Sequence, residues 1–589
     1  MKKRTKFLVG LILILAVVML LGSIHYLYNT KLNDSNSTKK VVSGEKIDDW
    51  EYDPENIADY DGTKGGYNWN FNQFDSTGIA TMESTTISGS QNSDLGFTVG
   101  GAQNIENYRE NIENGYFPLM TDITYNGIFS EYYFDTGNDN AEENTEDMFY
   151  PSYSVAKSKD PISGEDEYYM SVGLNSNIKE SDFQRKKLNL VLVLDISGSM
   201  DSYFDEYYYD YSFEENEKDA KTKMKIAQES INMLIDRLNP DDSLGIVLFE
   251  SGSHVAKELN LNSNVDLDAI KDHILEVEAT GGTNFEAGYE DATELFEDYE
   301  LVNNEEYENR IIVLTDAMPN IGETSDEGLL GMVKDNAENG IYTTFLGIGV
   351  DFNTELIEEI GDVRGANYYA VNNEDEFNSK MDEEFEYMVT PLVFDLKLNL
   401  ESEGYTIEKV YGSDTENYGE LMNVNTLFPS KSVDGETKGG IVLLKLKKES
   451  DSEDPLKLTV EYTDRAGEKH SNEQVVEFKN SDEEFYDNTG IRKGIVLTRY
   501  VNVIRDWIAY ERTEDDKFMI LYTTGINEFD EEYYYSLGEQ ERQSVELTVS
   551  DEYKKIFADL KSYIENENKE LKDETLEKEI EILDKLIEL

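Results

Sequence analysis

The 589-residue sequence contains no cysteine. This absence excludes disulfide bonds, thiol catalysis, zinc sites built from cysteine and lipid attachment at an N-terminal cysteine. Histidine is nearly as scarce, and none of the four histidines belongs to a His-Glu-x-x-His pattern. Zinc hydrolysis and Ser-His-Asp catalysis therefore lose most of the side chains that they need. For an exported protein, the lack of cysteine fits a bacterial surface better than a secreted animal protein, which usually carries disulfides.

Basic residues are also few, since 52 Lys and Arg stand against 124 Asp and Glu and give a formal net charge of −72. Phosphate binding needs clustered Lys and Arg, so nucleic acid is not an expected partner. The charge also predicts repulsion from anionic lipid surfaces and a dense layer of counter-cations. A hydrophobic content of 39% is nevertheless ample for packed cores. The length suggests about three or four domains.

The N-terminal residues 1–28 carry the long apolar run of the chain. The first six residues are mostly basic, and Phe7–Leu21 is apolar apart from Gly10. About 20 such residues can cross a bilayer as a helix, with the basic end in the cytoplasm. A cleaved signal peptide has a shorter apolar region, normally about 7–15 residues, and a small-x-small cleavage site that is not evident here. We therefore expect a single-pass anchor in the cell membrane, or a secreted protein if the segment is cleaved, with the remainder outside the cytoplasm either way.

Residues 29–74 are polar and acidic, which predicts a linker. Residues 75–183 predict a mixed α+β flanking region. Gln103–Asn114 has helical spacing, whereas Tyr125–Phe134 and Glu167–Leu174 alternate like strands.

Residues 184–391 alternate regularly between apolar strand-like runs and amphipathic helical segments. The predicted strands are Leu190–Leu194, Ser243–Phe249, Arg310–Thr315, Ile341–Gly349 and Ala366–Val371, and the predicted helices are Asp219–Leu238, Leu267–Val277, Phe285–Tyr299 and Glu374–Val389. This order predicts an α/β fold with a doubly wound, mostly parallel, Rossmann-like sheet and helices on both faces. In such sheets the ligand site lies outside the carboxyl ends of the strands.

The last two regions change character. Residues 392–483 contain strictly alternating segments, such as Phe394–Leu400 and Leu456–Tyr462, which predict a β-sandwich-like domain. Residues 484–589 predict a helical region, with helices over Thr489–Tyr510 and Asp551–Leu589. The final helices could pair within the chain or offer a coiled-coil surface to a partner. Each half of the pattern spans only about two heptads, so pairing within the chain is favoured.

Three loops of the α/β region carry oxygen ligands. Asp195, Ser197 and Ser199 follow the buried strand Leu190–Leu194 on alternate positions, so that their oxygens can converge. Thr283 lies on a glycine loop that opens a helix, and Asp316 ends another buried strand. Hard oxygen ligands of mixed charge suit Mg²⁺ or a similar cation. Capping of turns or of a helix would explain any one of these loops, but all three in this order favour a metal site.

Together these loops resemble the von Willebrand factor type A (VWA) domain and its metal-ion-dependent adhesion site. The resemblance implies that Asp195, Ser197, Ser199, Thr283 and Asp316 bind Mg²⁺ or Mn²⁺, with Ca²⁺ as a further candidate, and that an acidic residue of a protein ligand completes the shell. The chain departs from the family at Ala317, where many members have glycine, which puts the freedom of that loop to rearrange in doubt.

The order of elements from about residue 104 to 507 also resembles bacterial membrane-anchored relatives of the inter-alpha-trypsin inhibitor heavy chains and the calcium-activated chloride channel regulators. The flanking segments that carry this resemblance are Asn107–Ile112 and Tyr168–Leu174. An insertion rich in tyrosine and acidic residues, Asp201–Glu217, directly follows Ser199. It is either a mobile acidic loop or a segment that folds over the metal face, as a contact surface or as an internal acidic ligand.

These observations predict a non-enzymatic, metal-dependent, adhesion-type binding protein on the extracytoplasmic face of a bacterial-type membrane. An alternative is an envelope assembly or maintenance component that uses the VWA domain to dock a membrane complex. An enzyme with Ser197 or Ser199 as nucleophile is disfavoured, because no histidine lies near either serine in the sequence.

Overall fold

The computed structural model describes residues 46–54, 94–103, 105–137, 147–210, 221–297, 299–302, 305–357, 363–371, 384–413, 421–450, 455–478, 483–512 and 541–589. The chain separates into two units, Met1–Ile47 and Asp48–Leu589, and every element below belongs to the second. The predicted anchor of residues 1–28 lies outside the described residues. Within the part that is described, no helix combines the length and the apolar composition needed to cross a membrane.

A seven-stranded sheet forms the centre of the α/β region, in the order β2-β11-β10-β9-β6-β7-β8. Only the β7–β8 pair is antiparallel, so the predicted doubly wound, mostly parallel sheet is confirmed. The strands are β2 (Ala102–Gln103), β6 (Lys187–Asp195), β7 (Ser243–Phe249), β8 (Ser253–Leu261), β9 (Tyr307–Thr315), β10 (Ile341–Ile348) and β11 (Asn367–Val371). The helices are α4 (Lys223–Asp236), α5 (Leu267–Leu275), α6 (Phe285–Glu297), α7 (Asp326–Glu338), α8 (Thr354–Ile357) and α10 (Phe385–Met388).

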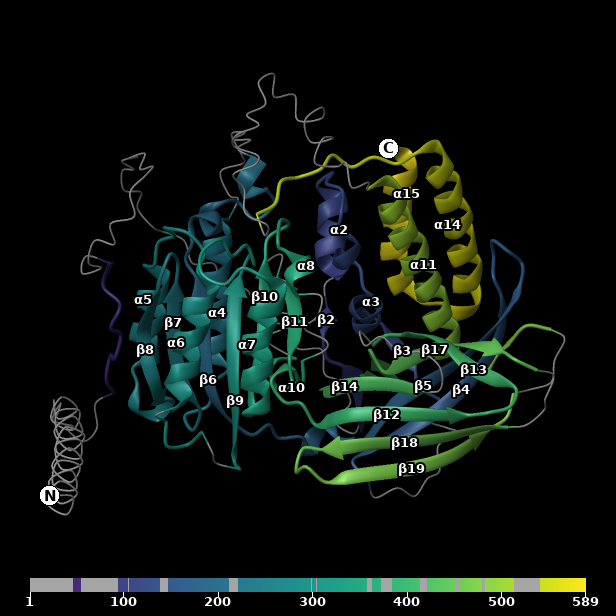
Figure 1. Ribbon diagram of the computed structural model, residues 1–589, viewed down its shortest axis with the longest axis horizontal. Helices are drawn as coiled ribbons and strands as arrows, with labels where there is room; N and C mark the ends of the chain where they lie inside the picture. Colours follow the sequence, from purple (N-terminus) through teal and green to yellow (C-terminus); the bar gives the residue numbers. More distant parts are fainter. Residues whose placement is uncertain are drawn as a thin grey trace, which may run out of the picture. The chain divides into compact units, whose positions relative to one another are not determined.

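Helices cover both faces of this sheet (Figure 1). Along β6, Leu190 and Leu192 belong to a buried cluster with residues of α4 and α5. The alternate residues Val191 and Val193 belong to a second cluster with residues of α6 and α7. Side chains of a strand point alternately to the two faces of its sheet. Because helices cover both faces here, every residue of the run is apolar.

Both edges of the sheet recruit segments from outside the α/β region. At one edge, β2 pairs with β11 in parallel. At the other edge, the Glu51 backbone N–H donates to the Ala256 carbonyl of β8 (2.8 Å). The Trp50 ring stacks on His273 (5.4 Å between centroids). The described part of the predicted linker is therefore docked on the edge of the sheet, where the Trp50 ring packs against the domain. The acidic composition of the segment did not predict this packing.

A ten-stranded, antiparallel sheet combines segments from before and after the α/β region. Strand β1 pairs with β5 on the N-terminal side of the sequence and with β14 on the C-terminal side. Residues 75–183 and 392–483, which the sequence analysis treats separately, therefore share one sheet and one buried core. Its strands are β1 (Asp94–Val99), β4 (Phe149–Lys159), β5 (Asp166–Lys179), β12 (Val393–Glu401), β13 (Tyr405–Tyr411), β14 (Leu421–Ser430), β17 (Ile441–Lys448), β18 (Leu456–Asp464), β19 (Lys469–Val476) and β20 (Phe485–Tyr486).

The strand predicted over Tyr125–Phe134 is wrong for most of its length. The chain forms helix α3 (Tyr125–Glu131), followed by the short strand β3 (Tyr133–Asp135), which pairs with β16 (Glu436–Lys438). The Thr124 side chain caps the helix by accepting a hydrogen bond from the Gly127 backbone N–H (2.8 Å). The buried residues Ile128, Phe129 and Tyr132 lie three and four positions apart, a helical spacing that a short apolar run conceals.

The C-terminal helices pair within the chain, as predicted. Helices α11 (Thr489–Glu511), α14 (Asp551–Leu571) and α15 (Glu577–Glu588) share a buried cluster with α3 and with α2 (Ile105–Glu113). A polar contact lies inside this cluster: Glu579 of α15 is fully buried, forms an ion pair with Arg109 of α2 and accepts a hydrogen bond from the Tyr132 hydroxyl (2.9 Å).

We expect Glu579→Gln to lower the free energy of unfolding by about 2–4 kcal/mol, because the buried Arg109 guanidinium would lose one of its two carboxylate partners. Glu581→Gln, two residues along the same helix and exposed, is the matched control and should change it by less than about 0.5 kcal/mol. Urea unfolding followed by circular dichroism measures both. Equal effects of the two substitutions would contradict a structural role for the Arg109–Glu579 pair.

Candidate metal centre

Three loops meet at the carboxyl edge of the parallel sheet. Strand β6 ends at Asp195, and the next turn brings Ser197 and Ser199 to the same side. The loop before α6 is attached to this turn by two backbone hydrogen bonds, from the Thr280 N–H to the Ile196 carbonyl (2.6 Å) and from the Gly198 N–H to the Gly281 carbonyl (3.1 Å). Asp316 follows β9, the neighbour of β6 in the sheet.

All five predicted site residues are buried at this edge. Asp195, Ser197, Ser199, Thr283 and Asp316 are each at most 4% exposed. The Ser197 and Ser199 hydroxyl oxygens lie 3.0 Å apart and share a hydrogen bond. Asp195 accepts hydrogen bonds from the Ser197 backbone N–H (2.9 Å) and from the Thr315 hydroxyl (2.6 Å). These bonds fix the orientation of the Asp195 carboxylate before any ligand arrives.

Asn320 positions the Thr283 loop from the third side. Its side-chain oxygen accepts a hydrogen bond from the Thr283 backbone N–H (2.9 Å), and its own backbone N–H donates to the Thr283 carbonyl (3.0 Å). The loop that follows Asp316 is therefore joined directly to the loop that carries Thr283.

A buried lysine, which the sequence analysis missed, completes the centre. Lys223 at the start of α4 is fully buried, and its Nζ lies 3.0 Å from Asp316 Oδ2 and 2.5 Å from Asp351 Oδ1. Burial by itself lowers the pKa of Lys223, but the attraction of Asp316 and Asp351 outweighs it, so the pKa is raised and the ammonium stays charged. Asp351 lies three residues beyond the carboxyl end of β10, at the same edge of the sheet as Asp195 and Asp316 but outside the apolar run that marks the strand. Nothing in the amphipathic pattern of α4 distinguished Lys223.

The charges at the centre do not balance. Burial, followed by repulsion from Asp316, raises the pKa of Asp195 to about 7. Burial raises the pKa of Asp316 as well, and Lys223 opposes this shift. When ionised, the three buried carboxylates of Asp195, Asp316 and Asp351 exceed the single ammonium of Lys223 by two negative charges.

These residues fit a divalent cation. Such an ion would cancel the two excess negative charges, and its preferred ligands are the carboxylate and hydroxyl oxygens gathered here. Oδ1 of Asp316 is buried and accepts no hydrogen bond from the described residues. An oxygen in this condition is costly unless a cation lies against it.

Ala317, the departure from the family pattern, adopts a left-handed backbone with φ of 53°. Glycine enters this region freely, whereas another residue pays roughly 1 kcal/mol. The Ala317 backbone N–H donates to the Thr315 hydroxyl (2.9 Å), the group that also bonds to Asp195. The loop thus keeps the conformation that glycine favours, at some cost in strain.

The described part of the insertion, residues 201–210, lies against the loops of the centre; residues 211–217 lie outside the described residues. The Val350 backbone N–H donates to the Phe204 carbonyl (3.2 Å), and the Tyr208 backbone N–H donates to Asp351 Oδ2 (3.1 Å). A Cβ placed on Gly198 would lie 3.3 Å from the Tyr208 hydroxyl. These contacts favour the hypothesis that the insertion folds over the metal face.

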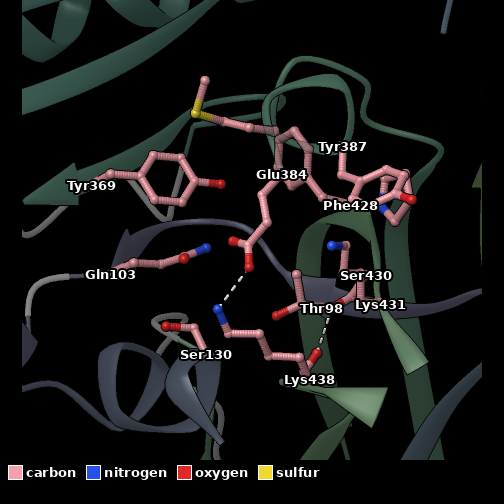
Figure 2. Close-up of a pocket in the computed structure, with 12 residues that line it drawn as sticks. Thr98, Gln103, Ser130, Tyr369, Glu384, Tyr387, Phe428, Ser430, Lys431 and Lys438 are labelled. Atoms are coloured by element: carbon pink, nitrogen blue, oxygen red, sulfur yellow. Dashed lines mark hydrogen bonds and ion pairs between the residues drawn. The ribbon is translucent and has the colours of Figure 1, made fainter. Parts of the chain in front are cut away.

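Other polar clusters have structural explanations. Asp464, Glu468 and His470 gather at the β18–β19 turn, where Asp464 accepts from the Glu468 N–H (2.8 Å) and contacts His470 (3.0 Å). Figure 2 shows a cavity beside the Glu384–Lys438 ion pair (2.8 Å). Its volume of about 30 Å³ admits a water molecule rather than a substrate.

Neither serine is paired with a histidine in the described part of the chain. The Ser197 and Ser199 hydroxyls bond to each other. The three described histidines contact carboxylates instead: His254 contacts Glu250, His273 contacts Asp48 and His470 contacts Asp464.

Comparison with known proteins identifies the family of the α/β region. Residues 190–319 match the family model of the von Willebrand factor type A domain, so the chain carries a domain of this family. Such domains typically mediate interactions between proteins and are generally not enzymes. The match includes Asp195, Ser197, Ser199, Thr283 and Asp316.

Relatives with curated descriptions match only part of this chain. The uncharacterized protein YfbK of Escherichia coli K12 is 26% identical over 216 residues, which are 36% of this chain and 33% of YfbK. The inter-alpha-trypsin inhibitor heavy chain H4 of Bos taurus is 27% identical over 176 residues, 29% of this chain and 17% of its own length. The chain therefore spans a third or less of these relatives.

Among solved structures, a von Willebrand factor type A protein from Catenulispora acidiphila aligns with a TM-score of 0.39 and 15% identity, covering 70% of this chain and 96% of that one. The ArnB paralog VWA2 from Sulfolobus acidocaldarius aligns with a TM-score of 0.36 and 16% identity, covering 75% and 97%.

We expect Lys223→Met to lower the free energy of unfolding in metal-free buffer by about 3–5 kcal/mol, because Asp316 and Asp351 would remain buried without their cation. Lys225→Met is the matched control, since this lysine lies on the same helix with its side chain 45% exposed, and should cost less than about 0.5 kcal/mol. Denaturant titration of both variants tests this. If Lys223→Met lowered the free energy of unfolding no more than Lys225→Met does, the stability of the buried cluster would not depend on the Lys223 ammonium.

Proposed function

We propose that the VWA domain binds Mg²⁺ or Mn²⁺ through Asp195, Ser197, Ser199, Thr283 and Asp316, and that the bound cation attracts an acidic residue of a protein partner. One observation carries this proposal: the five residues are buried on loops that hydrogen-bond to one another at the carboxyl edge of the sheet, where the buried carboxylates outnumber the single ammonium of Lys223. The matched family model and the general role of such domains in protein interactions support it.

The chain's own residues prepare the centre. The Ser197 backbone N–H and the Thr315 hydroxyl orient the Asp195 carboxylate. Lys223 neutralises part of the charge of Asp316 and Asp351, so these carboxylates can remain together before the ion binds. The bound cation would supply a concentrated positive charge toward which a partner carboxylate is drawn.

The net charge of the chain explains why the cation is needed. At −72, the chain repels an acidic partner over most of its surface. A bound divalent ion would create a local positive site, and only a carboxylate placed against the ion would be attracted strongly enough to bind. We further propose that residues 1–28 anchor the chain in a membrane and display this face outside the cytoplasm, as the sequence pattern predicts.

The metal alone tests the first step. We expect 1 mM Mg²⁺ or Mn²⁺ (roughly the upper range in which extracellular modules bind divalent ions) to raise the thermal midpoint of the wild-type chain, and EDTA to reverse the effect. Asp195→Asn and Ser197→Ala should abolish the shift while leaving the chain folded by circular dichroism.

Glu468→Gln at the β18–β19 turn is the control, since it alters the other cluster of potential ligands. The shift should persist in this variant. A shift that survives Asp195→Asn but disappears with Glu468→Gln would place the ion at the turn and reject the proposal.

A further inference from the structure

A segment from the C-terminal region, Glu541–Ser544, crosses to the metal face of the VWA domain; in Figure 1 it belongs to the yellow chain that leads into α14. The Arg542 guanidinium donates to the Phe352 carbonyl (2.6 Å). The Gln543 side chain donates to the Tyr209 carbonyl (3.1 Å). These contacts join residues more than 180 positions apart in the sequence.

The insertion after Ser199 holds this segment in place. Asp210 accepts a hydrogen bond from the Ser544 backbone N–H (2.8 Å) and a second from the Ser544 hydroxyl. Arg542 also lies over the Tyr207 ring, 5.9 Å from its centroid. Asp210 is the last described residue of the insertion, and its carboxylate therefore holds the segment.

The contacts of Glu541 connect its carboxylate to the loops of the candidate metal centre through Asn320 and Tyr209. Its Oε1 accepts hydrogen bonds from the Tyr209 hydroxyl (2.6 Å) and from the Asn320 side-chain amide (2.8 Å). The same Asn320 amide group accepts from the Thr283 backbone N–H (2.9 Å), so one side chain separates Glu541 from a proposed metal ligand. Burial, followed by the hydrogen bond to Glu541, raises the pKa of the Tyr209 hydroxyl, so this group stays protonated and donates to the carboxylate.

This placement is electrostatically unfavourable without a cation. When the carboxylates of Asp195, Asp316 and Asp351 are ionised, the centre has two excess negative charges, and Glu541 adds another carboxylate beside Asn320. A divalent ion reverses the sign of this interaction, because a carboxylate beside it becomes a ligand instead of a repelled neighbour. Being part of the same chain, Glu541 would be present at an effective concentration on the order of mM, which a free partner must overcome.

We propose that Glu541 is the internal ligand of this metal face: in the absence of a partner it occupies the position that a partner carboxylate takes, and the insertion clamps it there through Asp210. The proposal rests on the metal-dependent function proposed above. It assigns a regulatory role to residues 541–544, since binding of an acidic partner requires that the segment be displaced.

Titration of the full-length chain with Mn²⁺ tests the proposal with the metal as the only probe. Free Mn²⁺ is measured by electron paramagnetic resonance, and water-proton relaxation measures how many exchanging waters each bound ion retains. We expect Glu541→Gln to weaken Mn²⁺ binding by at least about tenfold, the lower end of what loss of a supporting residue costs a metal site. Each bound ion should also gain one exchanging water, which a purely structural role of Glu541 would not produce.

Glu546→Gln is the matched control, because this glutamate is exposed and lies two residues beyond the segment. It should behave as the wild type in affinity and in water count. The internal ligand would be rejected if Glu541→Gln bound Mn²⁺ with the affinity and the water count of the wild type while the separate variant Asp195→Asn bound none. That result would leave the proposed metal site intact. Wild-type Mn²⁺ binding by Asp195→Asn would instead reject the metal site itself.

Discussion

The candidate metal centre depends on a charge that is fully enclosed in protein. Lys223 has no access to solvent, yet its ammonium holds two carboxylates that belong to the ends of different parallel strands. Without it, Asp316 and Asp351 would repel each other and the loops after β9 and β10 would separate. Because a buried ion pair is stable only when its geometry is satisfied, the cluster fixes the distance between these loops.

The sequence revealed those features of the site that follow from strand direction. Asp195 and Asp316 end apolar runs, and runs covered on both faces are easily recognised as parallel strands, so their common edge could be predicted. Asp351 obeys the same rule but lies three residues beyond the end of β10, where the pattern no longer marks it. Lys223 occupies a position where an amphipathic helix commonly carries a surface lysine, and only the fold reveals its burial. Glu541 could not be predicted at all, since no local pattern connects it to a loop more than 200 residues away.

The same distinction applies to the fold. Local alternation identified most individual strands, but it did not show that β1 and β5 pair across the molecule with β14 and β17. The α/β region is therefore an insertion between strands of one antiparallel sheet, so the strands that precede it and follow it pair with one another. Helix α3 was missed because seven residues are too few to separate a helical period from an alternating one.

The docked segment around Trp50 limits how the edge of the mostly parallel sheet can pair with neighbouring molecules. Strand β8 lies at the edge of its sheet, and an uncovered edge offers backbone groups to any other chain that can align with it. The bridge between Trp50 and Lys257, together with the buried Asp49–Lys257 ion pair (3.1 Å), occupies part of this edge with a short, charged and bulky stretch. Copies of the protein crowded side by side would thus resist joining into continuous sheets through this edge.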